Sequence, residues 1–173
     1  MTPESSTAPT VALEALVREH AHVVHRYARV YLDPEDAEEV AAEVFAVAWR
    51  RGDEAPDHPR AWLLGVARRV VANHVRGRRR RLALLDRVGR AREPARAEQT
   101  ALLEELDALR AALARLRPAD RQVIALLGAE ELTTGEIARV LGISPDAAAA
   151  RVSRARRRLR AVYQPDHEGN GHE

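Results

Sequence analysis

Residues 133–160, TTGEIARVLGISPDAAAARVSRARRRLR, constrain the fold of this chain more than any other segment. They are typical of two short helices joined by a tight turn. Thr133 and Glu136 have the spacing of a capping box, in which each side chain bonds an unpaired backbone N–H of the other residue. Gly142 can adopt the left-handed conformation that ends this first helix. Ser144 then caps a second helix, and the proline after it suits the first helical position.

The second helix of this pair has one apolar side and an otherwise cationic surface. Its apolar positions recur at helical spacing and are Ala148, Val152, Ala155, Leu159 and Val162. Residues 147–163 also contain six arginines and no acid. A helix-turn-helix that binds DNA needs an apolar seam for its first helix and a cationic surface for phosphates and base edges. The segment therefore predicts nucleic acid as the partner.

Composition favours an all-α fold. Ala, Leu, Arg and Glu favour helices, aromatic residues make up only 3 %, and no run of alternating β-branched residues occurs. The absence of cysteine excludes disulfides and thiolate metal sites within the chain. No apolar stretch approaches the roughly 20 residues of a membrane span, and the first residues do not resemble a signal peptide. We therefore expect a cytoplasmic protein with no direct membrane insertion.

Charge is segregated along the chain. Residues 61–92 contain ten arginines against one acid, and the arginines of 147–163 form a second basic block. Each block follows an acidic helical segment. This arrangement indicates two modules of similar design, each with one face for nucleic acid and another for a different partner.

The spacing of apolar residues predicts helices over 11–32, over about 34–51, and from Pro59 into the arginine run 76–81. Asp33 is the expected cap of the second helix, followed by a proline. Two small helical domains joined by a flexible linker are expected. The segments are a disordered N-terminus (1–10), a first domain (11–81), a linker (82–100), a second domain (101–163) and a disordered tail (164–173).

These features resemble the extracytoplasmic-function sigma factors of bacterial RNA polymerase. The motifs that carry the resemblance are YAR (27–29), DPEDAEEVAAEVFAVAW (33–49), PRAWLLGVARRVVANHVRGRRR (59–80), LARLRPADRQVIAL (113–126) and the helix-turn-helix, in this order. The resemblance implies a first domain that binds core polymerase and the −10 element, and a second that binds the −35 element. It also implies an anti-sigma factor as a partner.

Three sets of site residues follow from the charge pattern and the resemblance. The acidic residues expected to bind core polymerase are Asp36, Glu39 and Glu43. Those expected at the separated −10 strand are Arg68, Arg69, Asn73, His74 and Arg76. Those expected at the −35 element are Ser144, Arg151, Ser153, Arg154, Arg157 and Arg158.

Two positions within these sets stay open, and several others bear on them. Asn73 and His74 can contact extruded bases or bond the chain locally, and Trp62 is expected in the core rather than stacked on a base. The chain departs from the family at residues 147–150, four alanines where relatives usually carry polar side chains. It also has Ala42 where many relatives have Gln. Phosphate contacts are therefore expected to carry more of the −35 affinity.

Two other classes of function, a free-standing DNA-binding regulator and an enzyme, account for less of the sequence. A free-standing helix-turn-helix regulator that binds duplex operator DNA would account for residues 118–163, but not for the first domain. An enzyme is disfavoured because no phosphate-binding loop, nucleophile motif or paired carboxylates occur. His20, His22 and His25 lie close in sequence, yet no acid completes a metal site. We expect no catalytic residue, metal, cofactor or small-molecule substrate.

Overall fold

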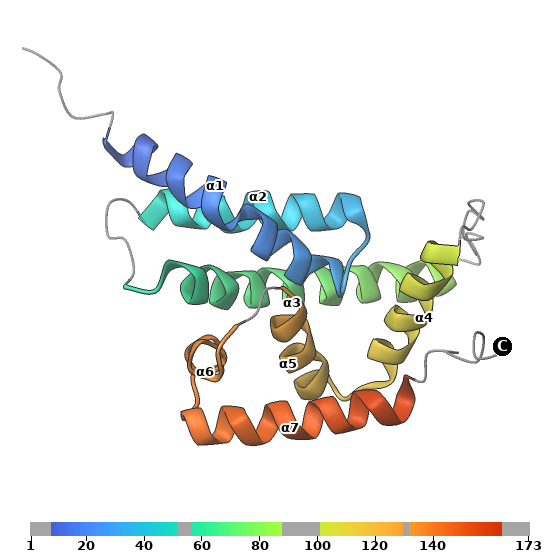
Figure 1. The fold of residues 1–173 in the computed structure, drawn as a ribbon. Coiled ribbons are helices and arrows are strands. Elements are labelled where there is room, and N and C mark those ends of the chain that lie inside the picture. The colour runs from blue at the N-terminus through green and yellow to red at the C-terminus, as the bar shows by residue number, and fades with distance from the viewer. Residues whose placement is uncertain (1–7, 52–56, 88–100, 130–131, 164–173) are drawn as a thin grey trace, which may run out of the picture.

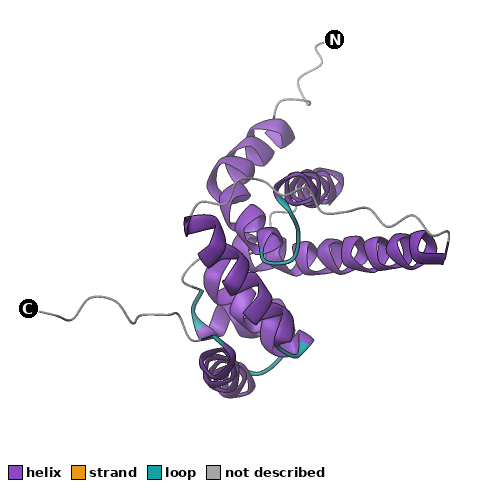
Figure 2. Cartoon of the chain, turned by 90° about the vertical axis from the view of Figure 1, so that its right-hand side faces the viewer, coloured by secondary structure: helices purple, strands orange, loops and turns teal. Residues whose placement is uncertain are grey.

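The protein is helical throughout the residues that the computed structural model describes, which are 8–51, 57–87, 101–129 and 132–163 (Figure 1). Figure 2 shows helices joined by loops in this part of the chain, and no strand. The helices are α1 (Ala8–Arg29), α2 (Pro34–Arg51), α3 (Pro59–Arg87), α4 (Ala101–Arg115), α5 (Pro118–Ala129), α6 (Thr134–Leu141) and α7 (Pro145–Val162). The all-α prediction is confirmed.

Helices α1, α2 and α3 pack on one another and form the N-terminal unit. α2 begins where the sequence predicts, because the Asp33 carboxylate accepts a hydrogen bond from the Asp36 backbone N–H at 3.0 Å. α1 ends at Arg29, three residues before the predicted end, and a turn follows. The most deeply buried side chains of this unit are Val23, Val24, Tyr27, Val40, Val44, Leu63 and Leu64.

α3 is longer than the sequence predicts. The prediction ended it within 76–81, but the helix continues to Arg87. Arginine and leucine are good helix formers, and a single glycine such as Gly77 costs only about 1 kcal/mol relative to alanine. The arginines at 78–81 are exposed, so solvent and salt screen their mutual repulsion. Of the expected linker (82–100), the first six residues therefore belong to α3, and 88–100 lie outside the described residues. Of the expected disordered N-terminus (1–10), residues 8–10 belong instead to α1, and 1–7 lie outside the described residues, as does the expected tail, 164–173.

Helices α4 to α7 form the C-terminal unit, which contains the helix-turn-helix. Both halves of the capping box are present: the Glu136 carboxylate accepts from the Thr133 backbone N–H at 2.9 Å, and the Thr133 hydroxyl oxygen accepts from the Glu136 N–H. Gly142 has a φ of 67° and ends α6. The Ser144 hydroxyl oxygen accepts from a backbone N–H of the first turn of α7 at 3.2 Å. The predicted start and stop signals are confirmed.

The two units share one hydrophobic core. α1 lies against α5 and α3 lies against α6, so α3 runs between the α1–α2 pair and the C-terminal unit (Figure 1). Leu63 and Leu64 of α3 belong to the same buried cluster as Leu126 of α5 and Ile137 of α6. α7 packs on the other side of α5 and α6. The two arginine-rich helices are thus held in one compact body.

Candidate nucleic-acid interface

Helix α7 has a buried face and a cationic outer face. The buried positions, which meet α5 and α6, are Ala148, Val152 and Ala155. Ser153, Arg154 and Arg157 are exposed on the outer face, and Arg151 is half-buried at its flank. Three of the residues predicted at the −35 element therefore lie where a DNA groove can reach them.

Arg158 lies closer to the protein interior than these residues. Its guanidinium forms an ion pair with the carboxylate of Asp120 on α5. The Asp120 side chain is only 9 % exposed, whereas that of Arg158 is 39 % exposed. Removing the cationic partner of a buried ion pair leaves an uncompensated buried charge. Arg158 thus joins α7 to α5, in addition to any contact it makes outside the protein.

The N-terminal end of α7 offers few polar side chains. Ser144 uses its hydroxyl oxygen as an acceptor for the cap, which leaves the hydroxyl proton free to be donated to a base or phosphate. Ala149 and Ala150 are exposed and carry no polar group. Direct reading of bases at this end is therefore limited.

Three of the residues predicted at the −10 strand form a row along one side of α3. Arg69, Asn73 and Arg76 are four and three residues apart, a spacing that places them on the same helix face, and all three are exposed. Arg76 donates a hydrogen bond to Asn73 Oδ1. Arg80 extends this cationic row by one turn. Such a row can follow a phosphate backbone while an amide bonds a base edge.

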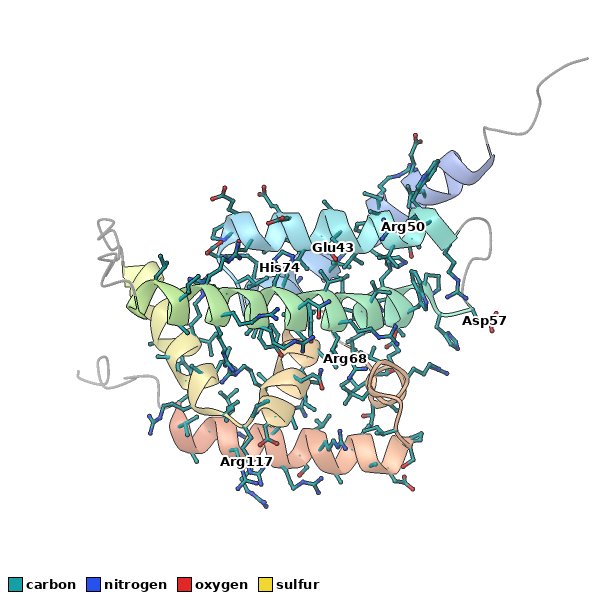
Figure 3. The ribbon with its side chains drawn as sticks, turned by 180° about the vertical axis from the view of Figure 1, so that it is seen from behind. Glu43, Arg50, Asp57, Arg68, His74 and Arg117 are labelled. Atoms are coloured by element: carbon teal, nitrogen blue, oxygen red, sulfur yellow. The ribbon has the colours of Figure 1, made fainter. Side chains whose placement is uncertain are left out.

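His74 and Arg68 point to opposite sides of α3, His74 toward α2 and Arg68 toward the C-terminal unit (Figure 3). His74 Nε2 is 3.2 Å from Oε2 of Glu43 on α2, which matches the local-bonding alternative. Arg68 lies on the side of α3 that faces the C-terminal unit, beside Val140 of α6. Its Nε atom is buried and has no hydrogen-bond partner. The predicted set of five therefore divides into two groups. Three residues form an exposed row on α3, and two lie against neighbouring helices, His74 against α2 and Arg68 against α6.

The acidic face of α2 contacts a histidine and an arginine of α3. Besides the Glu43 contact, Asp36 Oδ2 lies 3.8 Å from Arg78 Nη1. Glu39 is exposed, and so is Trp49, a residue that is 50 % exposed. At 3.6 residues per turn, its position ten residues further along α2 lies roughly 80° around the helix from Glu39, so the indole is beside the acidic face rather than within it. Exposed tryptophan is a frequent anchor of protein–protein interfaces. Sequence analysis did not single out Trp49, because a tryptophan at helical spacing is usually a core residue.

Trp62, the other tryptophan, is partly buried and packs against the core, in line with the prediction. The Arg51 guanidinium carbon lies 5.1 Å from the centre of its ring. This distance is within the range of a cation–π interaction. The exposed part of the ring is therefore already covered by an arginine of α2.

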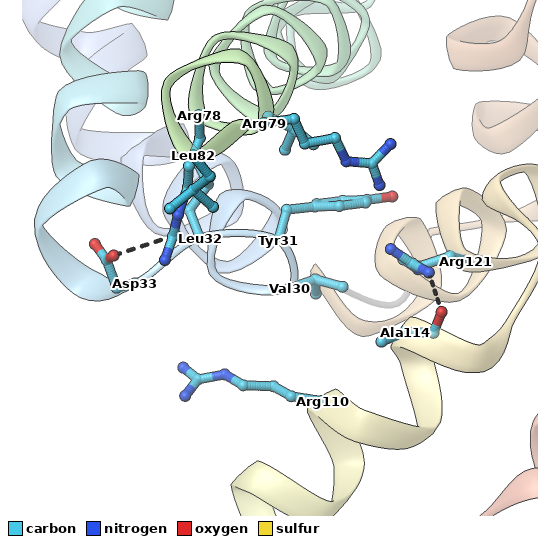
Figure 4. A pocket seen from close by; sticks show the side chains of 11 residues that line it. Val30, Tyr31, Leu32, Asp33, Arg78, Arg79, Leu82, Arg110, Ala114 and Arg121 are labelled. Atoms are coloured by element: carbon cyan, nitrogen blue, oxygen red, sulfur yellow. Dashed lines mark hydrogen bonds and ion pairs between the residues drawn. The ribbon is translucent and has the colours of Figure 1, made fainter. Parts of the chain in front are cut away.

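A cleft of about 420 Å³ lies where α3 and the α1–α2 turn face α4 and α5 (Figure 4). Four arginines line it, namely Arg78, Arg79, Arg110 and Arg121. Arg121 Nε donates to the Leu113 carbonyl oxygen at 2.6 Å and so caps the end of α4. Burial, and after it the charge of Arg110, lowers the pKa of Arg29 near this cleft. The cationic surface thus continues from α3 onto the C-terminal unit.

Two further observations concern metal binding and membrane insertion. Within the described ranges, no three His, Cys, Asp or Glu side chains are grouped so that they could hold a metal ion. In the same ranges, no helix has the length and apolar character needed to cross a membrane.

Family profiles and sequence relatives match the chain over most of its length. The profile of Sigma-70 region 2 matches residues 16–81, and that of Sigma-70, region 4 matches residues 106–159. RNA polymerase sigma factor CnrH of Cupriavidus metallidurans is 32 % identical over 170 residues, covering 91 % of this chain and 89 % of CnrH. The chain belongs to the extracytoplasmic-function sigma factors. Another member, SigL of Mycobacterium tuberculosis, is 32 % identical over 92 % of this chain and 93 % of SigL.

Solved structures of sigma factors share the fold. CnrH in complex with the cytosolic domain of CnrY has a TM-score of 0.67 at 25 % identity and covers 88 % of each chain. The sigma factor RpoE in complex with the anti-sigma factor NepR from Bartonella quintana has a TM-score of 0.59 at 23 % identity, covering 88 % of this chain and 94 % of that one. In this sigma factor, region 2 comprises the N-terminal unit, and region 4 begins within α4 and ends in α7.

The contacts that join region 2 to region 4 were not found from the sequence of this sigma factor. Arg60 of α3 pairs with Glu136 of α6, 76 residues further along the chain. Local periodicity carries no signal for such a pair, because both residues lie at positions where exposed polar side chains are common. The Arg60–Glu136 ion pair forms because the two regions pack against each other.

Proposed function

We propose that this sigma factor binds core RNA polymerase through the outer face of α2, the −10 element through α3 and the −35 element through α7. The observation that carries the proposal is that each sigma region presents one exposed cationic helix face. A sigma factor is a non-catalytic initiation factor. It selects the promoter, while the polymerase carries out the chemistry.

At the −35 element, Arg154 and Arg157 are placed to bind phosphates, and Ser153 is exposed beside them on the same side of α7. Because the neighbouring alanines cannot read bases, most of the binding free energy in this unit comes from phosphate contacts. Such contacts make affinity strongly salt-dependent. Specificity then rests on the few polar side chains, of which a single well-placed arginine can contribute about 1–3 kcal/mol of discrimination at a guanine.

At the −10 element, the row formed by Arg69, Asn73 and Arg76 is the proposed path of the separated strand. Arginines spaced along one face bind successive phosphates, and the Asn73 amide can bond a base once the duplex opens. His74 remains a member of the proposed site only if it gives up its contact with Glu43. Arg68 is half-buried in the cleft that it shares with Arg69, so its contact with the strand is proposed only at the edge of that cleft.

Core polymerase is proposed to bind Glu39, Glu43 and Trp49 on α2. Burial of the exposed indole supplies an apolar anchor, and the two acids, on the adjoining face of α2, select a cationic partner surface. Glu43 can exchange its contact with His74 for such a partner.

A protein partner that regulates this sigma factor is also proposed. CnrH is known in complex with the cytosolic domain of CnrY, and the same two-region architecture is present here. We infer that an anti-sigma factor binds this chain. We further propose that the sigma factor acts in the cytoplasm, where polymerase transcribes. Its activity requires no metal, cofactor or small-molecule substrate.

The proposal is tested with the purified protein and bacterial core RNA polymerase. Co-elution of the two, followed by discrete run-off transcripts from genomic fragments that core polymerase alone does not transcribe, is the expected result. Tight binding to duplex DNA without polymerase, and no transcripts, would instead indicate a free-standing regulator.

A further inference from the structure

The cleft between α3 and helices α4 and α5 is lined by cations from three helices. Arg78 and Arg79 of α3, Arg110 of α4 and Arg121 of α5 contribute four guanidinium groups, and among the described residues that line the cleft Asp33 is the only acid. The Asp33 carboxylate pairs with Arg78, with Oδ2 3.5 Å from Nη1. A concave surface with this excess of one sign of charge attracts a multiply charged anion.

The guanidinium group of Arg121 is fixed in orientation before any ligand binds. It donates from Nε to the Leu113 carbonyl oxygen at 2.6 Å and from Nη2 to the Leu116 carbonyl oxygen at 3.3 Å. Carbonyl oxygens orient a guanidinium group without neutralising its charge, so its attraction for an anion remains. A site whose groups are already ordered loses less conformational entropy on binding.

Tyr31 lies beside these cations without adding a negative charge. In Figure 4 the hydroxyl end of its ring points to the side of the cleft where the guanidinium groups of Arg79 and Arg121 lie. Burial raises the pKa of Tyr31, so the phenol stays uncharged at neutral pH. Its ring therefore forms part of the wall and does not repel an anion.

Two cations next to the cleft disfavour each other's charge. Arg29 of α1 and Arg110 of α4 are both half-buried, and Arg29 Nη1 donates to the carbonyl oxygen of the lining residue Leu32 at 3.1 Å. Burial, and after it the charge of Arg110, lowers the pKa of Arg29. An anion bound in the cleft would relieve this repulsion, because an opposite charge nearby favours the charged form of both groups.

The cleft also has an apolar wall, which a simple anion would leave uncovered. Val30 of the α1–α2 turn and Val75 and Leu82 of α3 line it. Leu82 is 51 % exposed, although it is a large apolar residue. A ligand that joins an anionic chain to a flat ring would cover both the cations and this wall. The volume of about 420 Å³ is within the range of about 300–1,000 Å³ that is typical of small-molecule sites.

The cleft is separate from the proposed path of the −10 strand. Val75, Arg79 and Leu82 are four and three residues apart and share one face of α3. At 3.6 residues per turn, this face lies roughly 120° around α3 from the exposed row that contains Arg69 and Arg76. A ligand in the cleft therefore binds side chains other than those assigned to the promoter.

We propose that this cleft binds a nucleoside polyphosphate, with its phosphate chain at Arg79, Arg110 and Arg121 and its base against Leu82. Arginine suits the chain because the fork of the guanidinium group matches paired phosphate oxygens. The nucleotide is a bound effector rather than a substrate or a required cofactor. This inference goes beyond the proposed function and is tested on the free protein.

Isothermal titration calorimetry with ATP, GTP, tripolyphosphate and adenosine tests this assignment. We expect 1:1 binding of a nucleoside triphosphate with a Kd below about 1 mM. Tripolyphosphate should bind more weakly because it leaves the apolar wall uncovered, and adenosine should not bind. Thermal unfolding gives an independent measurement: at 100 times Kd, the midpoint should rise by about 5–10 °C.

Substitutions separate the phosphate contacts from the base contact. Arg79→Ala combined with Arg110→Gln should weaken both ATP and tripolyphosphate by at least about tenfold, as expected for lost charge-assisted hydrogen bonds. Leu82→Ser should weaken ATP and leave tripolyphosphate unchanged. Arg50→Ala is the matched control, because Arg50 is exposed and lies about 25 Å along α2 from the start of that helix at the cleft. It should leave both affinities unchanged.

Four results would overturn the proposal. The first is the absence of saturable binding by either nucleotide. The second is a loss of affinity in Arg50→Ala as large as that in the cleft variants, since binding would then follow overall charge alone. The third is equal affinity for ATP and tripolyphosphate that Leu82→Ser does not change, which would assign the cleft to inorganic polyphosphate. The fourth is Arg79-dependent binding of a single-stranded oligonucleotide without binding of the nucleotides, which would assign the cleft to nucleic acid.

Discussion

The substitution Arg158→Ala tests whether Arg158 of α7 has a structural role in addition to a DNA-binding role. The change Arg158→Ala leaves the Asp120 carboxylate, 9 % exposed, without its cation. Removing one partner costs about 3–5 kcal/mol for a buried pair and about 0.2–1 kcal/mol for an exposed pair. Because Arg158 itself is 39 % exposed, we expect a loss of about 2 kcal/mol in the free energy of unfolding, between these limits.

Removing the charge of the acidic partner, Asp120, should lower the free energy of unfolding by less. Asp120→Asn keeps the shape of the side chain and leaves a guanidinium that water can reach, so we expect a loss of about 1 kcal/mol. Urea denaturation followed by circular dichroism measures both values. Arg157→Ala is the matched control, because a substitution at an exposed position usually changes stability by less than about 0.5 kcal/mol.

One pattern of results would refute this reasoning. If Arg158→Ala were as stable as the wild type and lost −35 affinity as strongly as Arg157→Ala, then the pair with Asp120 would contribute nothing to stability. Arg158 would then act as a DNA-contacting residue alone.

Three other substitutions test the remaining surfaces. Glu39→Arg combined with Trp49→Ala should weaken core-polymerase binding by about 30-fold or more, which corresponds to about 2 kcal/mol. Competition with labelled wild-type protein measures this affinity, and an unchanged value would exclude α2 as the docking face. Arg154→Ala and Arg157→Ala should each reduce the slope of log affinity against log salt by about 1, as for any lost phosphate contact; equal slopes at unchanged polymerase affinity would speak against phosphate binding. Gly142→Ala should destabilise the protein by about 1–2 kcal/mol, since alanine is strained at a φ of 67°; thermal unfolding checks this, and an unchanged midpoint would contradict it.

The elements with short-range signals could be predicted from the sequence. The caps at Thr133 and Ser144 and the stop at Gly142 depend on groups within four residues, so their side-chain chemistry is sufficient to place the ends of α6 and of α7. Asp33 marks the start of α2 for the same reason. The exposed faces of α3 and α7 follow from helical periodicity once these ends are known.

What could not be predicted depends on tertiary packing. The ion pairs Arg60–Glu136 and Arg158–Asp120 join residues 76 and 38 positions apart, and no local pattern specifies them. The same packing places Arg68 against α6, in one cleft with Arg139 and Val140. The end of α3 was misjudged because a run of like charges suggested a break, whereas exposed arginines tolerate a helix well.

The central claim, that α7 and α3 bind two separate promoter elements when polymerase is present, is tested most directly by footprinting of the complex with core polymerase. Nuclease protection and permanganate reactivity are measured on a promoter found by run-off transcription. The account predicts protection near −35 that Arg154→Ala with Arg157→Ala weakens, and reactive thymines near −10 that Arg69→Ala with Arg76→Ala abolishes, each with normal polymerase binding. Unchanged protection and reactivity in both double variants would contradict it.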